Sequence, residues 1–76
     1  MKRTLFHKRL ITLVNEHDCD GGIAGLCKIA GIPYQTMQTR LRQPRGLRMY
    51  EFDGIAGGLQ LNNDEQLDLL TAIRNG

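Results

Sequence analysis

The sequence predicts an all-α protein, a compact domain of five helices formed by residues 1–76. Apolar residues recur at helical spacing in five stretches, and no stretch is convincing as a strand. Glycine, proline or a polar turn separates most of these stretches. With 76 residues, 41% of them hydrophobic, the chain can form one domain with a single modest core.

The first two predicted helices have clear apolar faces. Residues 4 to about 17 place Phe6, Leu10, Leu13 and Val14 at i, i+4, i+7 and i+8. The segment HDCDGG then breaks the chain, and Asp20 is the expected N-cap of a short second helix. That helix repeats the spacing with Ile23, Leu26, Cys27 and Ala30. Gly31 should end it, because glycine accepts a left-handed conformation without steric cost.

The third predicted helix is much more polar. Pro33 suits its first turn, where a missing N–H costs nothing, and the helix should reach about Arg42, before Pro44 and Gly46. Its apolar stripe is only Met37 and Leu41, and Ile32 is expected to be buried in the turn that precedes it.

Two further helices complete the chain. The fourth runs from Met49 to about Leu59, with Phe52, Ile55, Ala56 and Leu59 on one side. The fifth opens with Asn63 and Gln66, which are spaced like a capping box, and with two acidic residues in its first turn. Its expected apolar edge consists of Leu67, Leu70 and Ile73.

The second and third helices, joined by a tight glycine turn, have the form of a helix-turn-helix. In such a unit the second helix projects from the body and can enter the major groove of DNA. Glutamine can bind an adenine edge, arginine a guanine edge, and a threonine methyl can contact thymine. Four of the ten basic residues lie within nine positions at the end of this unit: Arg40, Arg42, Arg45 and Arg48.

Charge divides the chain into two halves. Residues 1–46 hold eight basic and three acidic side chains, whereas residues 47–76 hold two basic and five acidic ones. The basic half suits a polyanion such as DNA, and the acidic half suits a partner or solvent.

The segments LCKIAGIPYQTMQTRLRQP and YEFDGIAGGLQLNNDEQLDLL resemble the helix-turn-helix class of lambda-repressor and Cro-like proteins, also called XRE-like regulators. The resemblance covers residues 5 to 73. Positions of the family pattern are filled by Leu26, Cys27, Gly31, Ile32 and Met37. It implies a five-helix lambda-repressor-like domain in which helices two and three bind DNA. The chain departs from the pattern at Ile23, where a phosphate-contacting glutamine is common, and at Arg40, where an apolar residue is frequent.

The resemblance also implies roles for individual residues. The base-reading residues would be Tyr34, Gln35, Gln38 and Thr39. Contacts to the DNA backbone would come from Thr36, Arg40, Arg42 and Arg45, with Lys28 and a Lys2–Arg3 arm as further candidates.

One such helix covers only about four to six base pairs, so regulators of this kind usually bind as pairs to half-sites about 34 Å apart. We therefore expect a homodimer that occupies a DNA operator as a repressor of the small phage type. The candidate dimer surface consists of Leu67, Leu69, Leu70 and Ile73, with Leu69 outside the core edge.

Other kinds of site are not expected. The cluster His17, Asp18, Cys19 and Asp20 lacks the paired spacing of structural zinc ligands, so His17 should end the first helix and Cys27 should lie in the core. No catalytic constellation stands out, so we expect neither an enzyme nor a cofactor nor a small-molecule ligand. No membrane-spanning run, secretory leader or disulfide framework is apparent, which favours a cytoplasmic protein.

Two alternatives remain open. One is a helical protein-interaction module, antitoxin-like or adaptor-like, whose basic face binds an acidic partner. The other is an architectural or excision factor that bends DNA, although no exposed wedge residue for intercalation stands out in the sequence.

Overall fold

The computed structural model describes residues 3–75, which form five α-helices and one short 3-10 helix and contain no β-strand. In chain order the elements are α1 (Leu5–Glu16), α2 (Gly22–Ala30), α3 (Tyr34–Arg42), η1 (Pro44–Gly46), α4 (Met49–Leu59) and α5 (Asn63–Asn75). The prediction of an all-α, five-helix chain is confirmed. The radius of gyration of 10.9 Å is what a compact chain of this length should have, about 11 Å.

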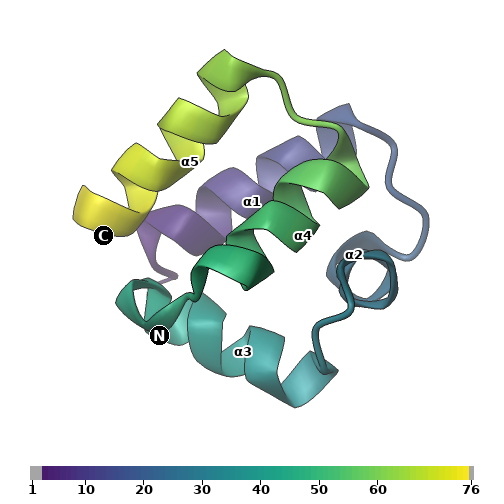
Figure 1. Cartoon of the computed structure of the whole chain (residues 1–76), viewed down its shortest axis with the longest axis horizontal. Coiled ribbons are helices and arrows are strands. Elements are labelled where there is room, and N and C mark those ends of the chain that lie inside the picture. The colour runs from purple at the N-terminus through teal and green to yellow at the C-terminus, as the bar shows by residue number, and fades with distance from the viewer. Residues whose placement is uncertain (1–2, 76) are drawn as a thin grey trace.

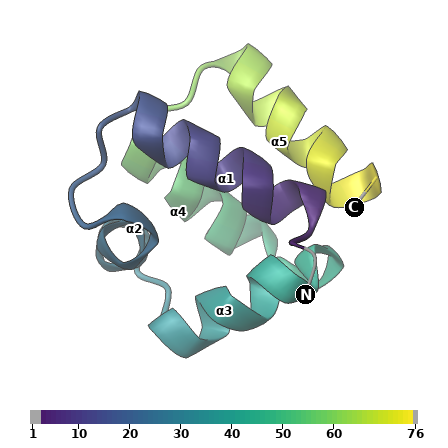
Figure 2. The same ribbon diagram turned by 180° about the vertical axis from the view of Figure 1, so that it is seen from behind.

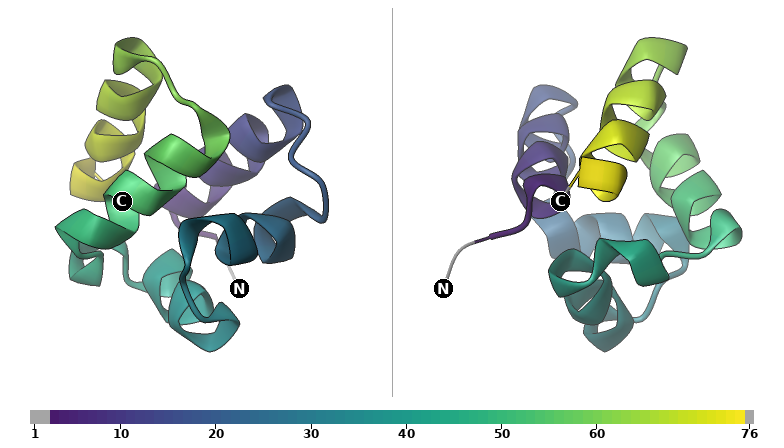
Figure 3. Two further views of the ribbon diagram at one scale, coloured as in Figure 1. Left: turned by 45° about the vertical axis from the view of Figure 1, so that its right-hand side comes forward. Right: turned by 90° about the vertical axis from the view of Figure 1, so that its left-hand side faces the viewer.

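The five α-helices pack around one core. Helix α4 lies between α5 and α2, and α1 lies behind α4 in Figure 1 and in front of it in Figure 2. The most extensive helix pairings are α2 on α4 and α5 on α1. Helix α3 lies at one edge of the molecule, far from the start of α5 in both views of Figure 3. No helix within residues 3–75 is both long enough and apolar enough to cross a membrane.

The predicted apolar faces of the first four helices meet in the core. Phe6, Leu10, Leu26, Met37 and Ile55 have no accessible surface. Cys27 is also buried, as expected, and this burial raises the pKa of its thiol. Every α-helix contributes at least one fully or nearly fully buried side chain to the core. Helix α3 contributes Met37 and Leu41.

Helix α4 approaches α2 closely because glycines face the contact. A Cβ atom on Gly54 would lie 2.7 Å from the backbone oxygen of Ala30, and one on Gly58 would lie 2.9 Å from a methyl carbon of Ile29. A larger residue at Gly54 would meet backbone and push the helices apart, whereas one at Gly58 would have to displace the Ile29 side chain. Gly54 above all therefore sets the distance between α4 and α2.

The predicted N-cap of α2 is wrong. The N-cap is Gly21, with φ of 79° and no side-chain cap, and Gly22 follows with φ of 60°. Two successive left-handed residues carry the chain into the helix, so Asp20 lies one residue too early to cap it. His17, by contrast, ends α1 as expected.

The capping box of α5 lies one residue earlier than the sequence suggests. The Glu65 N–H donates to Asn62 Oδ1 over 2.8 Å, and the Asn62 N–H donates to Glu65 Oε1 over 3.0 Å. Gln66 instead donates from its side chain to the backbone oxygen of Leu61 over 3.0 Å. Asn62 and Glu65 therefore have the roles that were expected of Asn63 and Gln66.

The apolar edge of α5 also differs from the expected one. Leu69 is completely buried and Ala72 nearly so, with Ile73 packed beside them, whereas Leu67 and Leu70 are 62% and 44% exposed. Leu69, Ala72 and Ile73 are spaced i, i+3 and i+4, which is the core-facing spacing of a helix. The placing of Leu69 outside the core was wrong, and this residue cannot belong to an outer surface.

Candidate nucleic-acid interface

The turn between α2 and α3 consists of three residues, Gly31, Ile32 and Pro33. Gly31 has φ of 72° and ψ of 28°, the left-handed conformation that ends α2. The Ile32 N–H then donates to the Cys27 oxygen over 3.0 Å, and the Ile32 side chain is buried. Pro33 precedes α3 as its N-cap, so the turn is fixed by glycine at one end and by proline at the other.

Helix α3 exposes a line of three polar side chains. Met37 and Leu41 are buried, and on the opposite side Gln35, Thr39 and Arg42 are all exposed, at i, i+4 and i+7. We call these three residues the outward line. Because α3 lies at the edge of the molecule (Figure 3), the outward line faces away from the core.

The other two predicted base-reading residues lie beside this line. Tyr34 is 55% exposed at the first position of α3, and Gln38, one turn later, is partly buried. The structure therefore brings Gln35 and Thr39 together on the most exposed side and leaves Gln38 on the flank.

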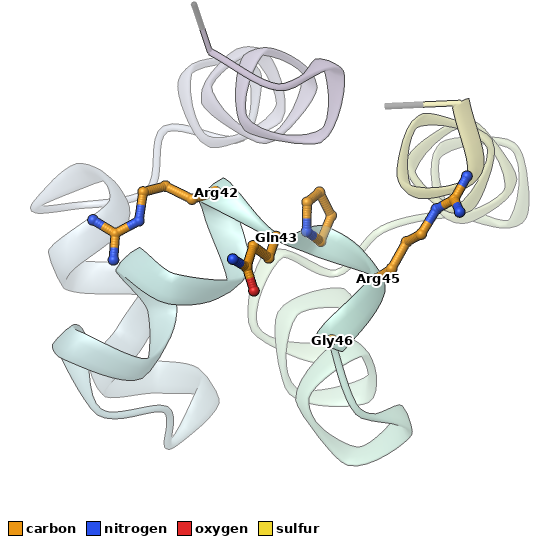
Figure 4. A pocket seen from close by; sticks show the side chains of 5 residues that line it. Arg42, Gln43, Arg45 and Gly46 are labelled. Atoms are coloured by element: carbon orange, nitrogen blue, oxygen red, sulfur yellow. The ribbon is translucent and has the colours of Figure 1, made fainter. Parts of the chain in front are cut away.

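An open pocket of about 410 Å³ lies where α3 ends and η1 begins. It is lined by Arg42, Gln43, Pro44, Arg45 and Gly46. Figure 4 shows the arginine side chains extending to opposite sides of this pocket, with the Gln43 amide between them. Arg45 also donates from Nη2 to the backbone oxygen of Arg74 over 3.0 Å, near the end of α5. Gln43 was not singled out in the sequence, because nothing marked it as different from other exposed glutamines.

The remaining predicted phosphate contacts occupy varied environments. Lys28 is exposed in the last turn of α2, and Thr36 is partly buried on α3. Arg3 is exposed, whereas Lys2 lies outside the described residues.

Arg40 differs from its arginine neighbours because it turns toward the protein. Its Nε donates to Glu51 Oε1 over 3.0 Å, and the side chains are 20% and 3% exposed. The Arg48 N–H donates to the same oxygen over 2.8 Å. This interaction joins the last turn of α3 to the first turn of α4, and sequence reasoning missed the role of Glu51.

The ionisation of Glu51 follows from these neighbours. Burial alone would raise the pKa of Glu51, but the Arg48 N–H, the Arg40 side chain and the charges of both arginines together hold this pKa below its ordinary value. Glu51 is therefore a carboxylate at neutral pH, and the contact with Arg40 is an ion pair.

A second contact, made by Thr4, holds the same end of α3. The Thr4 hydroxyl donates to the Leu41 backbone oxygen over 2.7 Å and accepts from the His7 N–H over 3.1 Å. Thr4 thus caps α1 and satisfies one of the last carbonyl groups of α3.

His17, which precedes the loop of residues 18–21, contacts the start of α5. His17 Nε2 lies 2.8 Å from Glu65 Oε2, which joins the end of α1 to the start of α5. Within residues 3–75, no three His, Cys, Asp or Glu side chains are grouped so that they could hold a metal ion.

Comparisons with known proteins add no family to this description. No protein-family model, curated protein or solved structure matches the chain.

Proposed function

We propose that this protein binds double-stranded DNA in a sequence-specific way and regulates transcription, in the manner of lambda-repressor and Cro-like proteins. The observation that carries the proposal is the outward line on α3, at the edge of the fold after a three-residue turn. Its amide, hydroxyl and guanidinium groups suit the edges of bases in the major groove. In a helix-turn-helix, the second helix exposes such a side and inserts it into the major groove.

The surrounding charges support the same proposal. Lys28, Arg42, Arg45 and Arg48 are exposed, on α2, at the end of α3 and along the segment that follows. A duplex with its major groove on α3 would bring phosphates toward Lys28 and Arg42, whereas the Arg45 side chain extends to the other side of the pocket, toward the end of α5. The first turn of α5, which holds Asp64 and Glu65, lies far from α3 in Figure 3.

Selection of bound sites from a random duplex pool tests the proposal directly. We expect an enriched sequence, and we expect affinity to fall with salt because phosphate contacts release counterions. Arg42→Gln should lower the slope of log affinity against log salt by about 0.9. Arg9→Gln is the matched control, because Arg9 pairs with Asp68 between α1 and α5, and its slope should equal that of the wild type. A pool without enrichment would contradict DNA reading and favour the protein-interaction module.

We further propose that two copies bind together. A groove of about 140 Å³ lies between the start of α4 and α5. Arg45 and Arg48 line it together with an apolar set, Pro44, Leu47, Met49, Phe52, Leu70 and Ile73. Met49 is 79% exposed at its edge, and Leu67 adds exposed apolar surface on α5. These residues, without the buried Leu69, make the candidate dimer surface. Sedimentation should reveal a dimer at high micromolar concentration, at least with operator DNA; a monomer under both conditions would contradict pairing.

A further inference from the structure

Arg40 occupies a different position from the arginines around it. Arg42 extends beside an open pocket, whereas Arg40 is largely buried and uses its Nε–H for Glu51. A Cβ atom on Gly46 would lie 3.3 Å from Arg40 Nη1, so the guanidinium also lies against the backbone of η1. The Arg40 side chain therefore connects α3 with the next two elements, η1 and α4.

Glu51 is in turn held in place by more than this arginine. It lies in the first turn of α4 and also accepts the Arg48 N–H, so its carboxylate is part of the helix start. Helix α4 is fixed to α2 through Gly54 and Gly58. The ion pair thus connects the last turn of α3 to two closely packed helices, α2 and α4.

From these contacts we infer that Arg40 is a positioning residue and not a DNA contact: its ion pair with Glu51 sets the orientation in which α3 presents Gln35, Thr39 and Arg42. Arg40 lies on the flank of α3, and the outward line lies on the exposed side. Rotation of α3 about its axis would move the outward line relative to a base edge, and hydrogen-bonded base reading tolerates little misalignment. The inference rests on the proposed function, since it assigns a role within DNA binding.

The test compares Arg40→Gln and Glu51→Gln with Arg42→Gln, each made in the full chain. Binding is measured to the selected duplex and to a random-sequence duplex over a range of salt concentrations. We expect Arg42→Gln to lower the salt slope on both duplexes by about 0.9. Arg40→Gln and Glu51→Gln should leave the slope unchanged, reduce affinity for the selected duplex about tenfold and leave affinity for the random duplex as in the wild type.

A double variant guards against simple unfolding. Arg40→Gln leaves the Glu51 carboxylate buried without its cation, which destabilises a fold; Arg40→Gln with Glu51→Gln replaces the pair by two amides. The double variant should lose no more selected-duplex affinity than the single variants, because both changes break one interaction. The Arg40 Nε–H resonance should also shift in Glu51→Gln, which reports the contact without DNA.

The possible results distinguish failure of the positioning role from failure of the proposed DNA binding. If the wild type binds DNA and Arg40→Gln lowers the salt slope as much as Arg42→Gln does, Arg40 contacts phosphate and the inference is overturned alone. Equal losses of affinity on the selected and random duplexes in folded Glu51→Gln would also overturn it. If the wild type binds neither duplex, the proposed function fails and the positioning role fails with it.

Discussion

Helix α4 has two very different neighbours. Toward α2 it presents Gly54 and Gly58, and the helices approach so closely that an added Cβ would overlap Ala30 or Ile29. Toward α5 it presents Met49 and Phe52 across an apolar groove that stays partly open. The first contact fixes the position of α2, which precedes α3, against α4. The second leaves apolar surface that a second copy of the chain could cover.

The largest expected effect comes from adding a methyl group where α4 packs against α2. Gly54→Ala should lower the free energy of unfolding by about 1–3 kcal/mol, because its methyl group must displace the Ala30 backbone. Gly57→Ala is the matched control in the same helix, since nothing lies within 4 Å of its Cβ position. It should raise the free energy of unfolding by up to about 1 kcal/mol. Urea denaturation measures both; equal effects would mean that α2 and α4 are not in close contact.

Acid should weaken the start of α4. The folded pKa of Glu51 lies below its unfolded value of about 4.3, so its contribution to stability is present above that pH and is lost as pH falls through the folded pKa. Between pH 5 and pH 3 the wild type should therefore lose more stability than Glu51→Gln. Thermal unfolding at each pH measures the difference, with Asp53→Asn, an exposed carboxylate of the same helix, as control. Parallel pH curves for the wild type and Glu51→Gln would contradict an ionised Glu51 in this contact.

The smallest effect on the stability of the monomer is expected at the groove between α4 and α5. Met49→Lys changes an exposed side chain, so the free energy of unfolding should move by no more than about 0.5 kcal/mol. Self-association should nevertheless weaken, because a further cation would enter a groove that Arg45 and Arg48 already line. Tyr50→Lys is the control: Tyr50 is 69% exposed but does not line the groove. Sedimentation measures the association of both variants. If both variants dissociate to the same extent, the pair does not form through the groove.

Sequence periodicity predicted most of this fold because the first four helices each have one main apolar face, although single apolar residues such as Leu5 and Ile29 lie outside it. Met37 and Leu41 are the only large aliphatic residues of α3, so its buried side could be assigned without the structure. Helix α5 has apolar residues at 67, 69, 70, 72 and 73, which fit two helical faces. The choice depends on contacts with other helices, such as His17 with Glu65 and Arg9 with Asp68.

The candidate site was predictable in part for a similar reason. Exposure of Gln35, Thr39 and Arg42 follows from the position of Met37 and Leu41 opposite them. The pairing of Arg40 with Glu51 does not follow, because it depends on how η1 folds between them. That contact gives a physical reason for an arginine at a position where the resemblance favours an apolar side chain, since most of the Arg40 side chain is buried.

The bond from the Thr4 hydroxyl to the Leu41 carbonyl joins residues 37 positions apart, so it closes a loop that contains α1, α2 and α3. Fraying of the first turn of α1 would break this bond and leave the last turn of α3 with one contact fewer, held by the Arg40–Glu51 ion pair and by the buried Leu41. Amide hydrogens near Leu41 should therefore exchange with solvent at rates that follow the opening of α1. The beginning of the chain thus influences how long the proposed reading surface keeps its shape.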